Sequence, residues 1–257
     1  MSRGRAQRNT GFVGWFARSH KGIIVALVAV MAAMLVVLAM QHVSTSRVAA
    51  GAHPGPIPTF TSAPSTQRAV FIGDSYTAGA GASDSSRTAF APLVAKDQGW
   101  KIVNLGRGGT GYVKEITDGT AKSACGEDVC HRYADMIQSA VDARPDVVVV
   151  SGGRNDSAVS EDSSAAAVRA FYQSLRAALP DSKIYAVQPI WDSSEAPESI
   201  AALGAVVDEA VRSVGGDYLA VGSPLAGHPD LISDDGVHPN DDGHQAVAAA
   251  VSRLLDR

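Results

Sequence analysis

The sequence predicts an α/β fold with three layers, α/β/α, around a central, mainly parallel sheet of five strands. Two observations support this prediction. After residue 67, short β-branched segments alternate with segments of helical spacing, and the strand-like segments are apolar on both faces. Buried parallel strands have this pattern, because helices cover both faces of their sheet. With 257 residues, of which 46% are hydrophobic, the chain can bury one sizeable core.

The predicted elements follow one another with short connections. The five strand-like segments are residues 69–73, 101–106, 146–153, 183–190 and 217–222. Helical spacing is clearest in residues 133–142, 164–179, 200–214 and 242–255. Glycine or proline stands at most of the joins, and right-handed crossovers between parallel strands place helices on both faces of the sheet.

Residues 22–40 are apolar throughout and predict a transmembrane helix that acts as a signal anchor. At about 1.5 Å per residue this segment reaches roughly 28 Å, close to the thickness of the hydrocarbon core of a bilayer. Residues 1–21 before it are basic, which predicts a cytoplasmic tail and an extracytoplasmic domain at residues 68–257. A cleaved signal peptide is the alternative, because residues 50–52 resemble a cleavage site, and the domain would then be secreted.

Residues 41–67 are rich in Pro, Ser, Thr and Ala without apolar periodicity, which is typical of a linker.

Cys125 and Cys130 lie in a polar loop, and in an oxidising compartment such a pair most readily forms a disulfide. Zinc is the alternative, but with His131 the pair still lacks a fourth ligand at suitable spacing. His244 has acidic neighbours that suggest a metal, yet its position fits the first turns of the last predicted helix. We therefore expect no metal.

Glycine and polar residues gather where the first three predicted strands end, at residues 73–75, 106–111 and 152–156. In open parallel sheets, ligands bind beyond the carboxyl ends of the strands. Residues 106–111 also match the G-x-G-x-x-G pattern of dinucleotide sites, but the polar, glycine-broken segment after them does not begin a helix. We therefore expect no cofactor. The domain has no basic stripe, which argues against nucleic acid as a partner.

Ser75, Asp235 and His238 combine into a candidate catalytic site. Taken alone, Ser75 is better explained as a helix cap whose oxygen accepts free backbone N–H groups. Asp235 and His238 stand directly before the last predicted helix. A carboxylate three residues before a histidine can accept the Nδ1 proton while Nε2 faces a serine hydroxyl. The three residues therefore suggest a serine nucleophile, its base and the acid that orients the base.

Asn155 and Gly109 are candidates for oxyanion stabilisation, together with the backbone N–H of Ser75. The side-chain amide of Asn155, at the mouth of the third predicted strand, can donate to an oxygen that becomes negative. Gly109 has no side chain, so its backbone N–H can come equally close. Each residue has a structural alternative, which is an Asx turn for Asn155 and a tight turn for Gly109.

Four blocks of the sequence resemble the SGNH (GDSL) hydrolase family in their order and position. They are residues 73–75, Gly109, residues 153–156 and residues 235–238. The resemblance covers the chain from about residue 68 to the C-terminus and implies a flavodoxin-like three-layer fold. It carries over these roles: nucleophile Ser75, base His238, orienting acid Asp235, and oxyanion donors Ser75, Gly109 and Asn155.

Three positions bear on how the family pattern applies to this chain. Tyr76 stands where many members have leucine, and we expect it to alter the wall of the substrate pocket. The choice of Gly109 over Gly108 rests on counting five residues from Asn104. Trp191, after the fourth predicted strand, either lines the substrate groove or is an exposed loop aromatic.

The resemblance implies a serine esterase or acylhydrolase that forms an acyl-enzyme on Ser75. The predicted location outside the membrane suggests its substrate, a short acyl group on a glycan, lipid or glycolipid of the cell envelope. An acyltransferase that moves the acyl group to a sugar hydroxyl would use the same residues. A carbohydrate-binding domain without turnover is the second alternative.

Overall fold

The computed structural model describes residues 34 and 66–256. The chain forms two units, and the second, Ala63–Arg257, holds the folded domain. The predicted basic tail, transmembrane helix and linker lie almost entirely outside the described residues. Within the described part of the chain, no helix has both the length and the apolar character needed to cross a membrane. The signal anchor and the linker therefore stay predictions.

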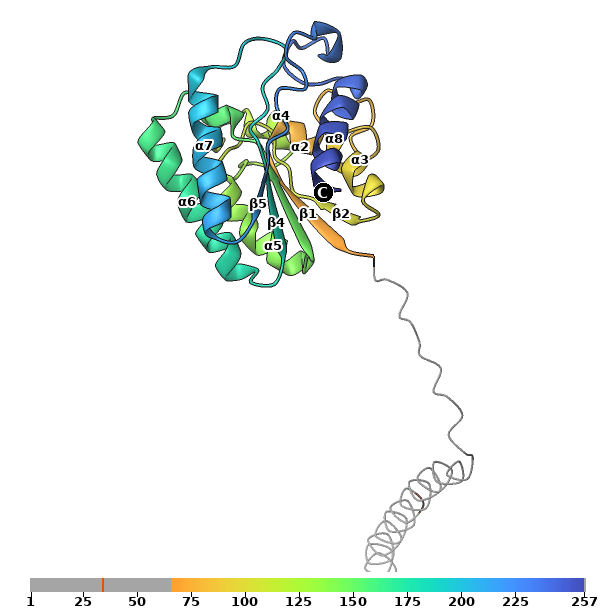
Figure 1. The fold of residues 1–257 in the computed structure, drawn as a ribbon, viewed down its shortest axis with the longest axis vertical. Helices are drawn as coiled ribbons and strands as arrows, with labels where there is room; N and C mark the ends of the chain where they lie inside the picture. Colours follow the sequence, from red (N-terminus) through yellow and green to blue (C-terminus); the bar gives the residue numbers. More distant parts are fainter. Residues whose placement is uncertain (1–33, 35–65, 257) are drawn as a thin grey trace, which may run out of the picture. The chain divides into compact units, whose positions relative to one another are not determined.

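Five strands form one sheet with the order β2-β1-β3-β4-β5 (Figure 1). They are β1 (Arg68–Gly73), β2 (Lys101–Asn104), β3 (Val147–Ser151), β4 (Lys183–Val187) and β5 (Asp217–Leu219). All pairings are parallel, and the register aligns Gly73 at the end of β1 with Ser151 at the end of β3. The carboxyl ends of these central strands therefore lie side by side. The predicted five-stranded parallel sheet is confirmed.

Helices cover both faces of the sheet. The helical segments are α2 (Ser75–Ala78), α3 (Phe90–Asp97), α4 (Ala121–Cys125), η1 (Tyr133–Met136), α5 (Ile137–Ala143), η2 (Arg154–Asp156), α6 (Glu161–Ala178), α7 (Glu198–Ser213), η3 (Pro229–Leu231) and α8 (Asp241–Leu255). In Figure 1, α5, α6 and α7 group on one face of the sheet, and α3 and α8 on the other. A hydrophobic core fills the space on each face. This is the three-layer arrangement that the sequence predicts.

Strand β1 contributes to both cores. Val70 and Ile72 pack into the core that includes residues of α6 and α7, and Ala69 and Phe71 pack into the core with α3 and α8. All four side chains are 0% exposed. Successive side chains of a strand point to opposite faces, so a strand covered on both sides is apolar throughout. Burial of each large side chain stabilises the fold by about 1.5–3 kcal/mol, so the position of β1 in the sheet, and with it the start of the loop that follows, is well fixed.

Several elements differ from their predicted bounds. β3 ends at Ser151 because Gly152 and Gly153 turn the chain, with φ of +148° and +102°, in the region that favours glycine. The helix predicted over residues 133–142 begins as the 3₁₀ segment η1 and continues as α5. Helix α3 is not among the predicted helices, because eight residues give too few repeats for a clear period.

A disulfide joins Cys125, at the end of α4, to Cys130. Backbone hydrogen bonds pair Cys130 with Ile116. Arg107 forms an ion pair with Glu127, inside the disulfide loop, with 2.9 Å between Nη2 and Oε1. The loop closed by the disulfide, residues 125–130, therefore contacts and stabilises the glycine-rich segment that follows β2.

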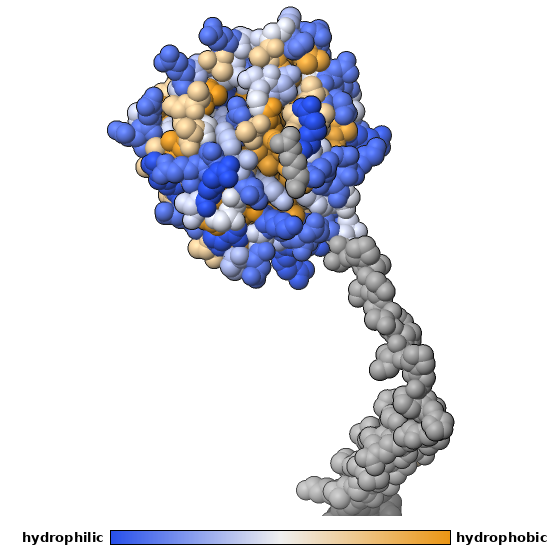
Figure 2. Space-filling model, viewed as in Figure 1, coloured by the Kyte–Doolittle hydropathy of each residue, from blue (hydrophilic) through white to orange (hydrophobic). Residues whose placement is uncertain are grey.

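The surface of the domain is mainly hydrophilic on the face shown in Figure 2, with smaller hydrophobic areas. Among the described residues, the exposed large hydrophobic side chains belong to Met34 and Val237. Val237 directly precedes His238. Among residues 66–256, the exposed large hydrophobic side chain therefore belongs to the loop that carries the candidate histidine.

Candidate active site

Strand β1 delivers Ser75 to the carboxyl edge of the sheet. Asp74 caps the short helix α2, its Oδ1 accepting the backbone N–H of Tyr76 at 3.0 Å, and Ser75 is the first residue of that helix. A Cβ at Gly73 would lie 2.0 Å from the carbonyl oxygen of Ser151. Only glycine therefore allows the end of β1 to pass this close to β3. Ser75 is 8% exposed.

Ser75, His238 and Asp235 form a continuous chain of hydrogen bonds. Ser75 Oγ lies 2.9 Å from His238 Nε2, although the two residues are 163 positions apart in the sequence. His238 Nδ1 lies 2.6 Å from Asp235 Oδ2. A carboxylate accepts, so Nδ1 carries the proton and Nε2 turns its lone pair toward the serine hydroxyl. The structure thus brings together the three residues that the sequence predicts.

The carboxylate of Asp235 is held by several donors. Its Oδ1 accepts the backbone N–H groups of Val237 and His238 and the hydroxyl of Ser233, each at 2.9 Å. Partial burial raises the pKa of Asp235, but these hydrogen bonds and the one from the imidazole outweigh it and hold the pKa well below its usual range. Asp235 is therefore ionised at neutral pH and oriented to stabilise a positively charged imidazole.

The loops with the predicted oxyanion donors also meet at this edge. Asn155 Nδ2 donates to the backbone oxygen of Thr110 at 2.9 Å. A side-chain amide has two N–H groups, so this bond orients the amide and leaves one donor for a ligand. Gly109, with φ of +73°, lies next to Thr110 in the chain. The backbone N–H of Arg107 donates to Gly73 at 2.9 Å, which holds the Gly109 segment against the strand that ends before the serine.

Two buried carboxylates shape the surrounding loops. Burial raises the pKa of Asp74 from 3.8 to about 6, against smaller opposing effects of the Tyr76 N–H and of Arg154. Burial also raises the pKa of Asp156. The Asp156 carboxylate accepts the backbone N–H groups of residues 112–114 at 2.7–3.2 Å. Asp156 therefore fixes the path of the chain after the glycine-rich segment.

Arg154 is absent from the sequence-based predictions, yet it contacts two other segments of the site, α2 and the loop after β4. Its guanidinium donates to the Tyr76 hydroxyl at 2.5 Å and to Asp192 at 3.1 Å, and it lies 4.3 Å from the centroid of the Trp191 ring. Tyr76 is 3% exposed and packs between segments of the site, and its expected place in the wall of a substrate pocket stays a prediction. Trp191 is half-buried and lines a cavity of about 320 Å³ beside α7. The sequence does place Arg154 in the family-like block at residues 153–156, which was the feature that could have marked it as part of the site.

His244 lies in the first turn of α8 and is fully buried. Its Nδ1 accepts the backbone N–H of Phe90 at 3.2 Å, and its Nε2 donates to the carbonyl oxygen of Ala80 at 3.1 Å. Asn240 caps the helix through the N–H of Gly243. Burial lowers the pKa of His244, in keeping with a neutral ring. Both ring nitrogens have backbone partners, so the predicted structural role is confirmed.

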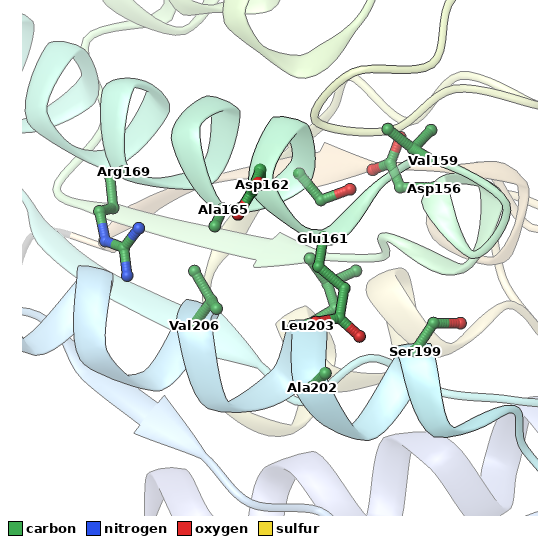
Figure 3. A pocket seen from close by; sticks show the side chains of 11 residues that line it. Asp156, Val159, Glu161, Asp162, Ala165, Arg169, Ser199, Ala202, Leu203 and Val206 are labelled. Carbon is green, nitrogen blue, oxygen red and sulfur yellow. The ribbon is translucent and has the colours of Figure 1, made fainter.

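Another cavity, of about 240 Å³, lies between α6 and α7 (Figure 3). Asp156, Glu161, Arg169 and Leu203 are among its lining residues, and the three residues of the candidate catalytic chain are not. The Asp156 carboxylate is already engaged by backbone donors. This cavity is therefore separate from the candidate active site.

Glu115, His131 and Asp135 are the described side chains that come closest to a metal-binding arrangement, with one ligand atom each within 4.8 Å of the others. All three residues are exposed. Arg132 Nε lies 3.4 Å from Asp135 Oδ2, so a cation would compete with the guanidinium and with water. This arrangement does not support a metal assignment.

Comparisons with known proteins point to one family. Residues 71–246 match the GDSL-like Lipase/Acylhydrolase family. The chain is 28% identical over 192 residues to the GDSL lipase Rv0518 of Mycobacterium tuberculosis, and the match covers 72% of this chain and 79% of that protein.

Solved structures with a similar fold include a family two carbohydrate esterase from Cellvibrio japonicus, with a TM-score of 0.55 and 20% identity over 75% of this chain and 62% of that one. A family 3 carbohydrate esterase from Clostridium thermocellum has a TM-score of 0.54 and 17% identity over 74% of this chain and 96% of that one. From the match over residues 71–246, the chain belongs to the GDSL-like lipase/acylhydrolase family.

Proposed function

We propose that the protein is a serine esterase that cleaves an ester through an acyl-enzyme on Ser75. The observation that carries this proposal is the hydrogen-bonded chain from Ser75 Oγ through His238 to Asp235. Membership of an acylhydrolase family supports the reaction class.

In the first half of the proposed reaction, His238 Nε2 takes the proton of the Ser75 hydroxyl as Oγ attacks the ester carbonyl. The carbonyl oxygen becomes negative and accepts hydrogen bonds from the backbone N–H groups of Ser75 and Gly109 and from the second amide N–H of Asn155. The imidazolium, stabilised by Asp235, then gives its proton to the alcohol oxygen as the C–O bond breaks. The acyl group remains on Ser75 as an ester.

In the second half, His238 takes a proton from water as the water oxygen attacks the acyl carbonyl. The bond between the acyl carbon and Ser75 Oγ breaks, Oγ regains a proton from the imidazolium, and a carboxylic acid leaves. A sugar hydroxyl in place of water would transfer the acyl group through the same steps.

The proposed substrate is a short acyl ester on a glycan, lipid or glycolipid of the cell envelope. The names of similar proteins, a lipase and two carbohydrate esterases, support this class. The proposed location is the outer face of the cell membrane, with residues 22–40 as anchor, and a disulfide between Cys125 and Cys130 fits an oxidising compartment. The exposed side chain of Val237 beside His238 offers an apolar contact for an acyl chain.

The test is hydrolysis of p-nitrophenyl acetate by the full chain purified in detergent. Ser75→Ala and His238→Ala should each lower kcat by about 10³-fold or more, while both variants unfold at the wild-type temperature. Ser123→Ala, at an exposed serine of α4, is the matched control and should keep wild-type activity. Full activity in Ser75→Ala would contradict the proposal. With an added glycan acceptor, acylated glycan in place of free acid would identify a transferase.

A further inference from the structure

The hydroxyl of Tyr76 joins the serine side of the site to the histidine side. Tyr76 Oη donates to the carbonyl oxygen of Val237 at 2.6 Å, and Arg154 Nη1 donates to Tyr76 Oη at 2.5 Å. Tyr76 directly follows Ser75, and Val237 directly precedes His238. One hydroxyl therefore connects the chain neighbours of the proposed nucleophile and base across 161 positions of sequence.

The direction of these two hydrogen bonds follows from the groups involved. A guanidinium can only donate, and a backbone carbonyl oxygen can only accept. Tyr76 Oη has a single proton, so it accepts from Arg154 and gives its own proton to Val237. The positive charge of Arg154 polarises the hydroxyl and strengthens the hydrogen bond that the hydroxyl donates.

The peptide bond between Val237 and His238 is held at both of its polar groups. Its carbonyl oxygen accepts from Tyr76, and its N–H donates to Asp235 Oδ1 at 2.9 Å. The Tyr76 ring also packs edge-on against the imidazole, with the ring centroids 5.8 Å apart. A planar peptide group fixed at two points has little freedom to rotate, so the backbone directs the His238 ring toward Ser75.

Arg154 is itself held in place. Its Nη2 lies 3.1 Å from Asp192 Oδ2, and both side chains are 11% exposed. Its guanidinium carbon lies 4.3 Å from the centroid of the Trp191 ring and 5.1 Å from that of Tyr76. A guanidinium held by a mostly buried carboxylate and two aromatic rings has little freedom to turn toward solvent. Arg154 is therefore placed to orient Tyr76 rather than to bind substrate.

We propose that Tyr76 and Arg154 are positioning residues for the esterase reaction. The Arg154 guanidinium orients the Tyr76 hydroxyl, which holds the Val237–His238 peptide so that His238 Nε2 stays within hydrogen-bond distance of Ser75 Oγ. This proposal rests on the proposed function, in which His238 is the base. It also gives Tyr76 a role that leucine, the residue of many family members at this position, could not fill.

Tyr76→Phe tests the hydroxyl alone, because it removes one oxygen and keeps the ring. In the full chain, kcat for p-nitrophenyl acetate should fall by about 10-fold to 100-fold, with KM within about twofold of wild type. Tyr172→Phe is the matched control, because it removes a buried hydroxyl that lies 3.0 Å from the hydroxyl of Tyr112 in the core beneath α6. The control should lose stability and keep kcat. A Tyr76→Phe variant with wild-type kcat would overturn the proposal.

A double-mutant cycle tests whether Arg154 acts through Tyr76. Arg154→Met should also lower kcat. The double variant, Arg154→Met with Tyr76→Phe, should have a kcat no lower than that of the less active single variant. Both substitutions remove the same chain of hydrogen bonds, from Arg154 through the Tyr76 hydroxyl to Val237. If the fold-losses in kcat of the two single variants multiply in the double variant, Arg154 acts independently of Tyr76, and its proposed role in orienting Tyr76 is overturned.

A readout without turnover separates this proposal from the proposed function. In ¹⁵N-histidine-labelled protein, the Nδ1 proton of His238, bonded to Asp235, should give a downfield NMR resonance that His238→Ala removes. The resonance should persist in Tyr172→Phe and broaden in Tyr76→Phe. If the resonance broadens in Tyr76→Phe but the wild-type protein shows no turnover, the positioning role of Tyr76 is supported and the proposed esterase function is refuted. An unchanged resonance in Tyr76→Phe would overturn positioning, whatever the turnover.

Discussion

Replacing Asp74 by Asn should change how the stability of the domain depends on pH. Asp74 is 1% exposed, and burial raises its pKa from 3.8 to about 6. Asparagine has nearly the same shape and can still accept the Tyr76 N–H as the cap of α2, but it does not ionise. The Asp74→Asn variant therefore removes one titration and leaves the packing nearly unchanged.

The sign of the effect follows from proton binding. The folded protein holds the Asp74 proton more tightly than the unfolded chain does, so this contribution to stability is fully present below pH 3.8 and is lost as the pH rises through about 6. The pKa difference of about 2.2 corresponds to about 3 kcal/mol at 1.36 kcal/mol per unit. About 2 kcal/mol of this loss falls between pH 4.5 and 7.5.

The assay is urea unfolding at several pH values, followed by the fluorescence of Trp100 and Trp191. The free energy of unfolding of Asp74→Asn, relative to wild type, should rise by about 2 kcal/mol from pH 4.5 to 7.5. His244 titrates in both proteins, so its contribution cancels in the difference. Ser123→Ala, which changes an exposed side chain that does not ionise in this range, should show no such trend. A pH-independent difference for Asp74→Asn would refute the reasoning.

Three further substitutions test other parts of the structure. Asp235→Asn should lower kcat for p-nitrophenyl acetate by about 10³-fold to 10⁴-fold, because the amide no longer stabilises the imidazolium; a small loss would argue against its orienting role. Gly73→Ala should destabilise the domain by about 3 kcal/mol or more in urea unfolding, because the new Cβ would lie 2.0 Å from the Ser151 oxygen, and an unchanged midpoint would contradict this steric argument. His244→Ala should lower stability by about 3 kcal/mol in thermal unfolding, because two backbone groups lose their partners and a cavity remains; an unaltered transition would show that these bonds contribute little.

The strands and most long helices could be predicted because their signal is local. A run such as Val147–Val150 is apolar on both faces, and burial on both faces of a parallel sheet requires that pattern. Strand ends were less predictable, since Gly152 and Gly153 continue an apolar segment in sequence while their backbone leaves the sheet. Helix α3 is too short for its period to be distinct.

The candidate catalytic chain was also readable, because Asp235 and His238 lie three positions apart and Ser75 follows a strand at the edge where ligands bind. The hydrogen-bond partners of the Tyr76 hydroxyl could not be predicted from the sequence. Its partners Val237 and Arg154 are 161 and 78 positions away, and no local pattern encodes which loop a buried hydroxyl will meet. Such contacts depend on how the loops pack once the sheet has formed.

The most direct test of the account is to locate the residue that a fluorophosphonate labels in the intact protein. Covalent capture requires a serine whose hydroxyl is activated by a neighbouring base. Peptide mass spectrometry should find the adduct on Ser75 in wild type and almost none in His238→Ala. A folded protein that stays unlabelled, or one labelled at a serine other than Ser75, would contradict the assignment of this site as a serine esterase.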